Sequence, residues 1–159
     1  MRQPIFISAC LLGMPCRYDG GSKPLLDLVK LIGQNRVIIP FCPEIQGGLA
    51  IPRFPAEIID GDGTMVIQGK ARVVNKKGED YTEQYLNGAR AVLEMAKDLH
   101  PKLIMLKSKS PSCGIGEIYD GSFNGILKQG DGVTAALLKR AGFEVCTELD
   151  YLNGLSRIS

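Results

Sequence analysis

The residues of this sequence best suited to chemistry are its five cysteines. In a chain of 159 residues they are too few for a disulfide scaffold, and in a reducing compartment such thiols serve as metal ligands, reactive groups or small buried residues. Cys10, Cys42 and Cys113 each follow a short apolar run, in loops rich in glycine and proline. Cys16 shares a loop with Cys10 and is a competing candidate for a ligand role. Cys146 ends a fourth apolar run, where we expect a buried structural thiol.

Three converging thiolates would bind a soft metal, because sulfur donors select zinc, copper(I) or an iron-sulfur cluster. The CxxC pairs typical of structural zinc are absent. The only histidine, His100, stands beside Pro101 at the expected end of a helix, and we interpret it as a surface residue or a helix C-terminal cation. A cluster held by three thiolates leaves one iron open for Lewis-acid catalysis, whereas a fourth ligand such as Cys16 would close it.

The elements before these cysteines must position them, and four short apolar runs are typical of buried strands, over residues 4–8, 36–41, 102–106 and 143–146. None alternates strictly, which is the habit of strands covered on both faces of a parallel sheet. Helical patterns lie between them, over residues 24–31, 82–99 and 132–140. This alternation predicts an α/β fold, a single Rossmann-like domain over residues 1–159 with an open, mostly parallel sheet. Ligands bind beyond the carboxyl ends of such strands, so Cys10, Cys42 and Cys113 are expected to meet at one edge.

Two local features add detail to this fold. Residues 65–67 and 71–74, separated by Gln68-Gly69-Lys70, suggest a small β-hairpin insertion. Thr82 or Asp80 is expected to cap the helix over residues 82–99, and Pro101 is expected to end it.

Composition and charge exclude several classes of partner. Apolar residues make up 45% of the chain and charged residues 23%, which are ordinary values for a globular protein. The net charge of +2 has no runs of like charge, which argues against a nucleic-acid duplex or an anionic membrane as partner. The apolar stretches are too short to span a bilayer and the N-terminus lacks a leader pattern, so we expect a cytoplasmic protein with a small-molecule partner. The sequence sets no oligomeric state.

Three motifs follow one another along the chain: SACLLG with RYDG (residues 8–13 and 17–20), CPE with GGL (42–44 and 47–49), and KSKSPSCG (107–114). Together they resemble the thiouracil desulfidase (TudS) family, over nearly the whole chain. The resemblance implies a catalytic 4Fe-4S cluster with three cysteine ligands, Cys10, Cys42 and Cys113. It also implies catalytic roles for Glu44 and Ser110. The implied substrate is a thiolated pyrimidine, either thiouracil or 4-thiouridine monophosphate.

Each candidate can be given a chemical role in such a reaction. A thiocarbonyl sulfur would bind the open iron, and Glu44 would act as general base for the attacking water, unless it merely bonds nearby backbone amides. Ser110 would hydrogen-bond the substrate or the leaving sulfide, although a serine before proline is also a common turn opener. Arg17, Ser112 and Lys107 lie in the same predicted loops and are the candidate substrate-binding residues.

Two other functions are compatible with the same cysteines. The alternative is a binding or regulatory protein without catalysis, in which the thiols hold zinc or a fully ligated cluster. A third is reversible disulfide chemistry between Cys10 and Cys16.

Overall fold

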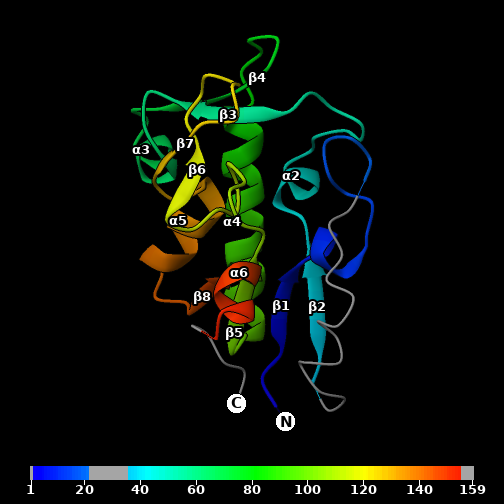
Figure 1. Ribbon diagram of the computed structural model, residues 1–159. Helices are drawn as coiled ribbons and strands as arrows, with labels where there is room; N and C mark the ends of the chain where they lie inside the picture. The colour runs from blue at the N-terminus through cyan, green and yellow to red at the C-terminus, as the bar shows by residue number, and fades with distance from the viewer. Residues whose placement is uncertain (1, 22–35, 155–159) are drawn as a thin grey trace.

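The computed structural model describes residues 2–21 and 36–154. A central four-stranded sheet has the order β2-β1-β5-β8, with every neighbouring pair parallel (Figure 1). Its strands are β1 (Ile5–Ser8), β2 (Ile38–Phe41), β5 (Leu103–Leu106) and β8 (Val145–Thr147). The predicted α/β fold with an open parallel sheet is therefore confirmed. The helix predicted over residues 24–31 lies outside the described residues.

The strands end level with one another at one edge of the sheet. Ser8 pairs with Phe41 across β1 and β2, while Leu106 pairs with Thr147 across β5 and β8. Ile7 pairs with Met105, which joins the two halves of the sheet in the same register. The segments that follow the four strands consequently start side by side.

Both faces of the sheet are buried, which explains the continuous apolar runs. Ile5 and Ile7 point to one face, where Tyr151 of α6 (Glu148–Leu152) packs against their cluster. Phe6 points to the other face, which is covered by α4 (Thr82–Leu99) and α5 (Val133–Arg140) (Figure 1).

Helix α4 has the bounds that the sequence predicts. The N-cap residue is Tyr81 rather than the predicted Thr82 or Asp80, and its side chain makes no capping hydrogen bond. The Asp80 carboxylate instead accepts a hydrogen bond from the Thr82 N–H at 2.8 Å, and the Thr82 hydroxyl accepts one from the Val73 N–H at 3.0 Å. At the other end His100 adopts a left-handed conformation with φ 48°, and Pro101 follows it. His100 is exposed, as expected for a residue that ends a surface helix.

The insertion between β2 and α4 differs from the prediction in one element. An antiparallel pair is present, formed by β3 (Ala56–Ile59) and β4 (Arg72–Asn75), but residues 65–67 are not its first strand. They belong to α3 (Gly63–Ile67), because the Asp62 carboxylate caps this helix by accepting from the Met65 N–H at 3.1 Å. This local cap outweighs the strand preference of Val66 and Ile67.

Three further short elements border the carboxyl edge of the sheet. A 3-10 helix, η1 (Ala9–Leu12), follows β1, and α2 (Pro43–Gln46) follows β2. A second antiparallel pair, β6 (Glu117–Tyr119) with β7 (Leu127–Gln129), includes a segment with no clear pattern in the sequence. Within the described residues, no helix has both the length and the apolar character needed to cross a bilayer.

Candidate active site

A pocket of about 350 Å³ opens at the carboxyl edge of the central sheet. Its walls come from the segments after β1, β2 and β5, together with β3 and the β6–β7 hairpin. Seven of the eight site residues predicted from the sequence line it: Cys10, Arg17, Cys42, Glu44, Lys107, Ser110 and Cys113. The strand ends thus bring together groups that are remote along the chain.

The local structure around Cys10 and Cys42 explains how each reaches the pocket. Cys10 lies in η1, a single tight turn that ends at Gly13 with φ 90°, a conformation natural to glycine. Cys42 is the N-cap residue of α2, and Pro43 occupies the first helical position. Both cysteines therefore occupy the first positions after a buried strand.

Cys16 is the residue that connects these two thiols. Its side chain forms hydrogen bonds with both Cys10 and Cys42, and the Cys42 sulfur lies 3.9 Å from the Cys16 carbonyl oxygen. The hydrogen bond with Cys10, aided by burial, raises the pKa of the Cys16 thiol to about 11. The bond with Cys16, then burial and the charge of Glu44, raise the pKa of the Cys42 thiol well above its usual range.

Cys113 is held in the loop after β5 by two serines. The Ser110 hydroxyl oxygen accepts hydrogen bonds from the N–H groups of Cys113 and Ser112, both at 3.1 Å. The Ser8 hydroxyl at the end of β1 donates to the Cys113 sulfur at 3.7 Å and accepts from the Lys107 N–H at 3.0 Å. Burial, followed by the charge of Glu44, raises the pKa of the Cys113 thiol well above its usual range.

The donor set fits an iron-sulfur cluster. All five cysteines lie in the described residues and none forms a disulfide, so the thiols around the pocket are available as soft ligands. In residues 2–21 and 36–154 no group of three or more His, Cys, Asp or Glu side chains is arranged to hold a single metal ion. Cys10, Cys42 and Cys113 instead surround a shared space from three separate segments, as ligands of a larger cluster would. Because the raised pKa values of Cys42 and Cys113 favour their protonated forms, ligation by these two thiols must release protons.

Glu44 and Ser110 flank these sulfurs with different hydrogen-bonding capacities. The Glu44 carboxylate, in the first turn of α2, accepts a hydrogen bond from the Cys42 thiol at 3.4 Å. The Ser110 oxygen already accepts from two backbone N–H groups, which use both of its acceptor positions. Ser110 therefore holds the Cys113 loop and retains only its hydroxyl proton to donate to a ligand.

Ser112 is the predicted site residue that the structure does not bring to the pocket. Its side chain is fully buried, and its hydroxyl lies 3.0 Å from that of Thr134 in α5. Ser112 is therefore placed behind the pocket lining, against Thr134 and next to Cys113. Arg17 and Lys107 do line the pocket.

The Arg17 guanidinium lies 5.5 Å from the centre of the Tyr18 ring and 3.9 Å from the Asp19 carboxylate, whereas the Lys107 ammonium group lies 3.2 Å from the Glu148 carboxylate.

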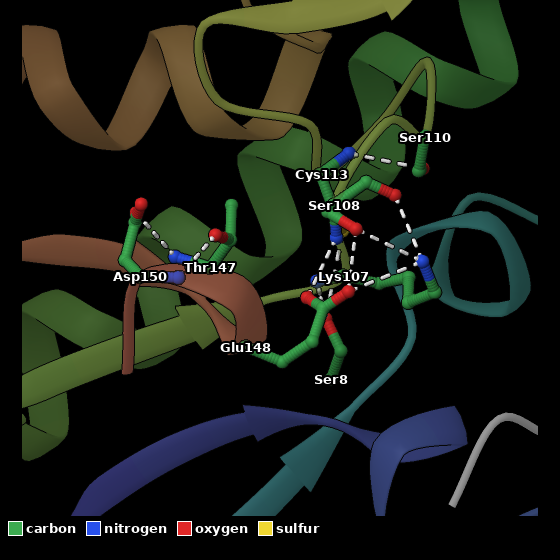
Figure 2. Close-up of polar contacts among 8 residues, drawn as sticks. All are labelled: Ser8, Lys107, Ser108, Ser110, Cys113, Thr147, Glu148 and Asp150. Carbon is green, nitrogen blue, oxygen red and sulfur yellow. Dashed lines mark hydrogen bonds and ion pairs between the residues drawn. The ribbon is translucent and has the colours of Figure 1, made fainter. Parts of the chain in front are cut away.

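Several pocket residues carried no motif in the sequence. Three half-exposed aromatic rings line it, Tyr18, Phe54 and Tyr119, and they offer flat apolar surfaces to a planar ligand. Glu148 lies just behind the wall, where it contacts Lys107 and Ser108 (Figure 2). Glu148 directly follows β8, so the strand-end reasoning that selects Cys10 and Cys42 also applies to it.

Known proteins share this fold and much of this sequence. A family model described as 2-thiouracil desulfurase matches residues 5–150. The uncharacterized protein YbbK of Bacillus subtilis (strain 168) is 46% identical over 144 residues, which cover 91% of this chain and 95% of YbbK. A solved structure, described as the 4Fe-4S-dependent thiouracil desulfidase TudS, has a TM-score of 0.83 and 38% identity, covering 96% of this chain and 95% of that chain. This chain belongs to the 2-thiouracil desulfurase family.

Proposed function

We propose that this protein is an iron-sulfur-dependent, non-redox desulfidase of thiolated pyrimidines. The observation that carries the proposal is the convergence of Cys10, Cys42 and Cys113 on one pocket that Glu44 also lines. The similarity to a 4Fe-4S-dependent thiouracil desulfidase supports the same assignment. The reaction exchanges the thiocarbonyl sulfur for the oxygen of water, and it releases a carbonyl product and hydrogen sulfide without net oxidation or reduction.

In this proposal Cys10, Cys42 and Cys113 would hold the cluster. Such a cluster, when bound, supplies a soft Lewis acid that polarises the bond between carbon and sulfur. Cys42 loses its thiol proton to solvent on ligation, and its hydrogen bond to Glu44 is lost. The Glu44 carboxylate oxygen that accepted this hydrogen bond can then accept one from a water molecule. Glu44 removes a proton from that water as it attacks the ring carbon, and afterwards returns the proton to the departing sulfur.

Other pocket residues orient the substrate in this reaction. The remaining hydroxyl proton of Ser110 donates to the substrate or to the sulfur that leaves. The rings of Tyr18, Phe54 and Tyr119 stack against the planar base, and Arg17 contributes positive charge beside them. The pocket of about 350 Å³ holds both the cluster and the substrate in this proposal, and both thiouracil and 4-thiouridine monophosphate are candidate substrates.

Anaerobic cluster reconstitution followed by a sulfide-release assay tests the function. The wild-type protein is expected to turn brown, to bind about four irons and to release sulfide from thiouracil or 4-thiouridine monophosphate. Serine substitutions of Cys10, Cys42 or Cys113 should each abolish iron binding, whereas Cys16→Ser should keep the iron. A colourless protein with stoichiometric zinc would contradict the proposal, as would a loaded protein that releases no sulfide from any thiolated base. Iron loss in Cys16→Ser would make Cys16 a ligand.

A further inference from the structure

Among the residues that the structure describes, four basic side chains line the pocket, and they differ in how many partners they have inside the protein. They are Arg17, Arg53, Lys107 and Lys109. A cation with strong partners inside the protein must give them up before it can bind a ligand, whereas a cation without partners has no such cost. The partners of each side chain therefore indicate which one recognises a negatively charged ligand.

The Lys107 ammonium group is fully engaged within the protein. It donates hydrogen bonds to the Ser108 carbonyl at 3.0 Å and to the Ser108 hydroxyl at 3.2 Å, and it lies 3.2 Å from a Glu148 carboxylate oxygen (Figure 2). A lysine has three N–H donors, so these three contacts use them all.

Glu148 strengthens the hold on Lys107, because its carboxylate is buried. Its exposed fraction is only 5%, and it also accepts hydrogen bonds from the Ser108 N–H at 2.8 Å and from the Ser108 hydroxyl. If Lys107 moved onto a ligand, this carboxylate would lose its only nearby cation among the described residues. A buried charge without its partner is strongly unfavourable, so Lys107 is expected to keep its contact with Glu148 when a ligand binds.

The two arginines are also engaged, though less completely. Arg53 donates to the carbonyl oxygens of Ala50 and Cys16, at 3.2 and 3.3 Å, and so ties down the loop that carries Cys16. Arg17 is divided between the Tyr18 ring and the Asp19 carboxylate. Arg17 lies in the loop that leads away from Cys10, and Arg53 contacts that loop through the Cys16 carbonyl oxygen.

Lys109 differs from the other three in two respects. Across residues 2–21 and 36–154, no hydrogen bond or ion pair involves its ammonium group. Its backbone has φ 67°, a left-handed conformation that costs a lysine on the order of 1 kcal/mol. A bridge to the buried Ile118 of β6 holds the backbone in this conformation. The fold thus keeps Lys109 in an unfavourable left-handed conformation, although its ammonium group contacts no partner among the described residues.

We infer that Lys109 recognises an anionic group of the substrate, such as the phosphate of a thiolated nucleotide, and sets the preference for nucleotide over free base. This inference rests on the desulfidase function proposed above. It assigns Lys107 to the pocket wall and the ligand charge to Lys109, two residues along the same loop.

The test compares two substrates that differ only in the presence of the phosphate group. Reconstituted wild type, Lys109→Asn and Lys109→Arg are assayed for sulfide release from 4-thiouridine and from 4-thiouridine monophosphate. Asparagine removes the charge and tolerates a left-handed backbone, while arginine keeps the charge. Lys97→Asn, at an exposed lysine of α4, is the matched control. Binding of uridine monophosphate and of uridine to the same proteins is measured by calorimetry, which needs no turnover.

Lys109→Asn is expected to lower kcat/KM for the nucleotide about 10- to 100-fold, mainly through KM, and to leave the nucleoside nearly unchanged. Uridine monophosphate binding should weaken by a similar factor, and Lys109→Arg should restore most of both losses. Equal losses for nucleotide and nucleoside, or no loss for either, would overturn the inference while the desulfidase function stands. If wild type releases no sulfide, the proposed function fails, and the calorimetric difference between uridine monophosphate and uridine still decides the role of Lys109.

Discussion

The candidate catalytic centre places a carboxylate next to a thiol that is proposed to bind a metal. Glu44 follows Cys42 by two residues, and the short helix α2 turns both side chains into the pocket. A Glu44 carboxylate oxygen lies 3.4 Å from the Cys42 sulfur, so the two groups are in direct contact. As the proposed general base, Glu44 is expected to contribute to turnover more than to folding.

Replacement of Glu44 by glutamine tests this role. Glu44→Gln keeps an oxygen that accepts from Cys42 but removes the ability to take a proton from water. We expect normal iron content and a fall in kcat of about 10²- to 10⁴-fold for sulfide release. The matched control is Glu94→Gln, at an exposed position of α4, which should behave as wild type. Unchanged turnover in Glu44→Gln would remove the residue from the mechanism.

Single residues show both the reach and the limit of sequence reasoning. The sequence could place three cysteines together, because Cys10, Cys42 and Cys113 each follow a strand of a parallel sheet. The three strands are neighbours in the sheet, so the segments after them lie side by side. The surroundings of the Ser112 hydroxyl could not be predicted, because Ser110 and Ser112 lie in the same loop and the sequence does not show which way each side chain points. Glu148 was missed because a lone carboxylate after a strand has no partner that spacing can reveal.

At the scale of elements, the position of α2 depends on close contact with α4. A side-chain carbon added at Gly88 would lie 1.9 Å from the Pro43 carbonyl oxygen, and one added at Gly47 would lie 1.9 Å from that of Gln84. The two helices therefore approach backbone to backbone, which only glycine allows. This contact fixes the segment that carries both Cys42 and Glu44.

Substitution of Gly88 by alanine should disturb that contact. Although alanine is the better helix former, the clash with Pro43 must push α2 away, and we expect a loss of about 1–3 kcal/mol in unfolding free energy. Iron content after reconstitution should fall as well, because Cys42 moves with α2. Denaturant unfolding and iron analysis measure the two effects. Asn87→Ala, at the exposed neighbouring position, should lose neither stability nor iron, and equal behaviour of the two variants would contradict the argument.

The start of α4 makes a prediction about pH. Hydrogen bonds from the Thr82 hydroxyl and N–H lower the pKa of Asp80 below its usual 3.8. A carboxyl whose pKa is lowered by folding stabilises the protein above its unfolded pKa, and this contribution is lost as pH falls through the folded value. Asp80→Ala should therefore cost roughly 0.5 kcal/mol at pH 7, and this cost should shrink as pH falls below 3.8.

Thermal unfolding of both proteins across this pH range tests the assignment. Asp98→Ala, at the exposed far end of α4, serves as the control, because a carboxylate there makes no helix cap. A cost for Asp80→Ala that stays constant down to pH 2 would show that the hydrogen bond from Thr82 is not the cause.

The elements also show why local pattern is an incomplete guide. The bounds of α4 were predictable, since an 18-residue amphipathic stripe with Asp80 before it and Pro101 after it has one interpretation. Residues 65–67 were not, because three apolar residues fit a strand or a helix equally well, and the Asp62 cap decides between them. A short apolar run can therefore be assigned to a helix or a strand only together with the capping and turn residues beside it.

For the whole molecule, the site lies where the apolar core reaches the edge of the central sheet, because Cys10 and Cys113 belong to core clusters and also line the pocket. The three apolar clusters lie on the two faces of the central sheet and beneath the β3–β4 pair. The pocket lies at the edge, where its walls are single turns and loops that follow the strands. A cluster bound by Cys10, Cys42 and Cys113 would tie three such segments together, whereas the sheet beneath them has its own buried contacts.

Removal of the cluster should therefore loosen the edge and leave the sheet intact. A ligand that binds only the folded state adds to its stability, so the cluster-free protein should melt at least about 5 °C lower than the loaded protein. Amide hydrogen exchange should accelerate in residues 9–16, 42–46 and 107–114, while Ile5–Ser8 and Leu103–Leu106 stay protected. The Cys113→Ser protein provides a second cluster-free sample and should show the same pattern. Faster exchange spread evenly over the sheet would mean that the fold itself depends on the cluster, and identical exchange in both states would mean that these three segments do not share it.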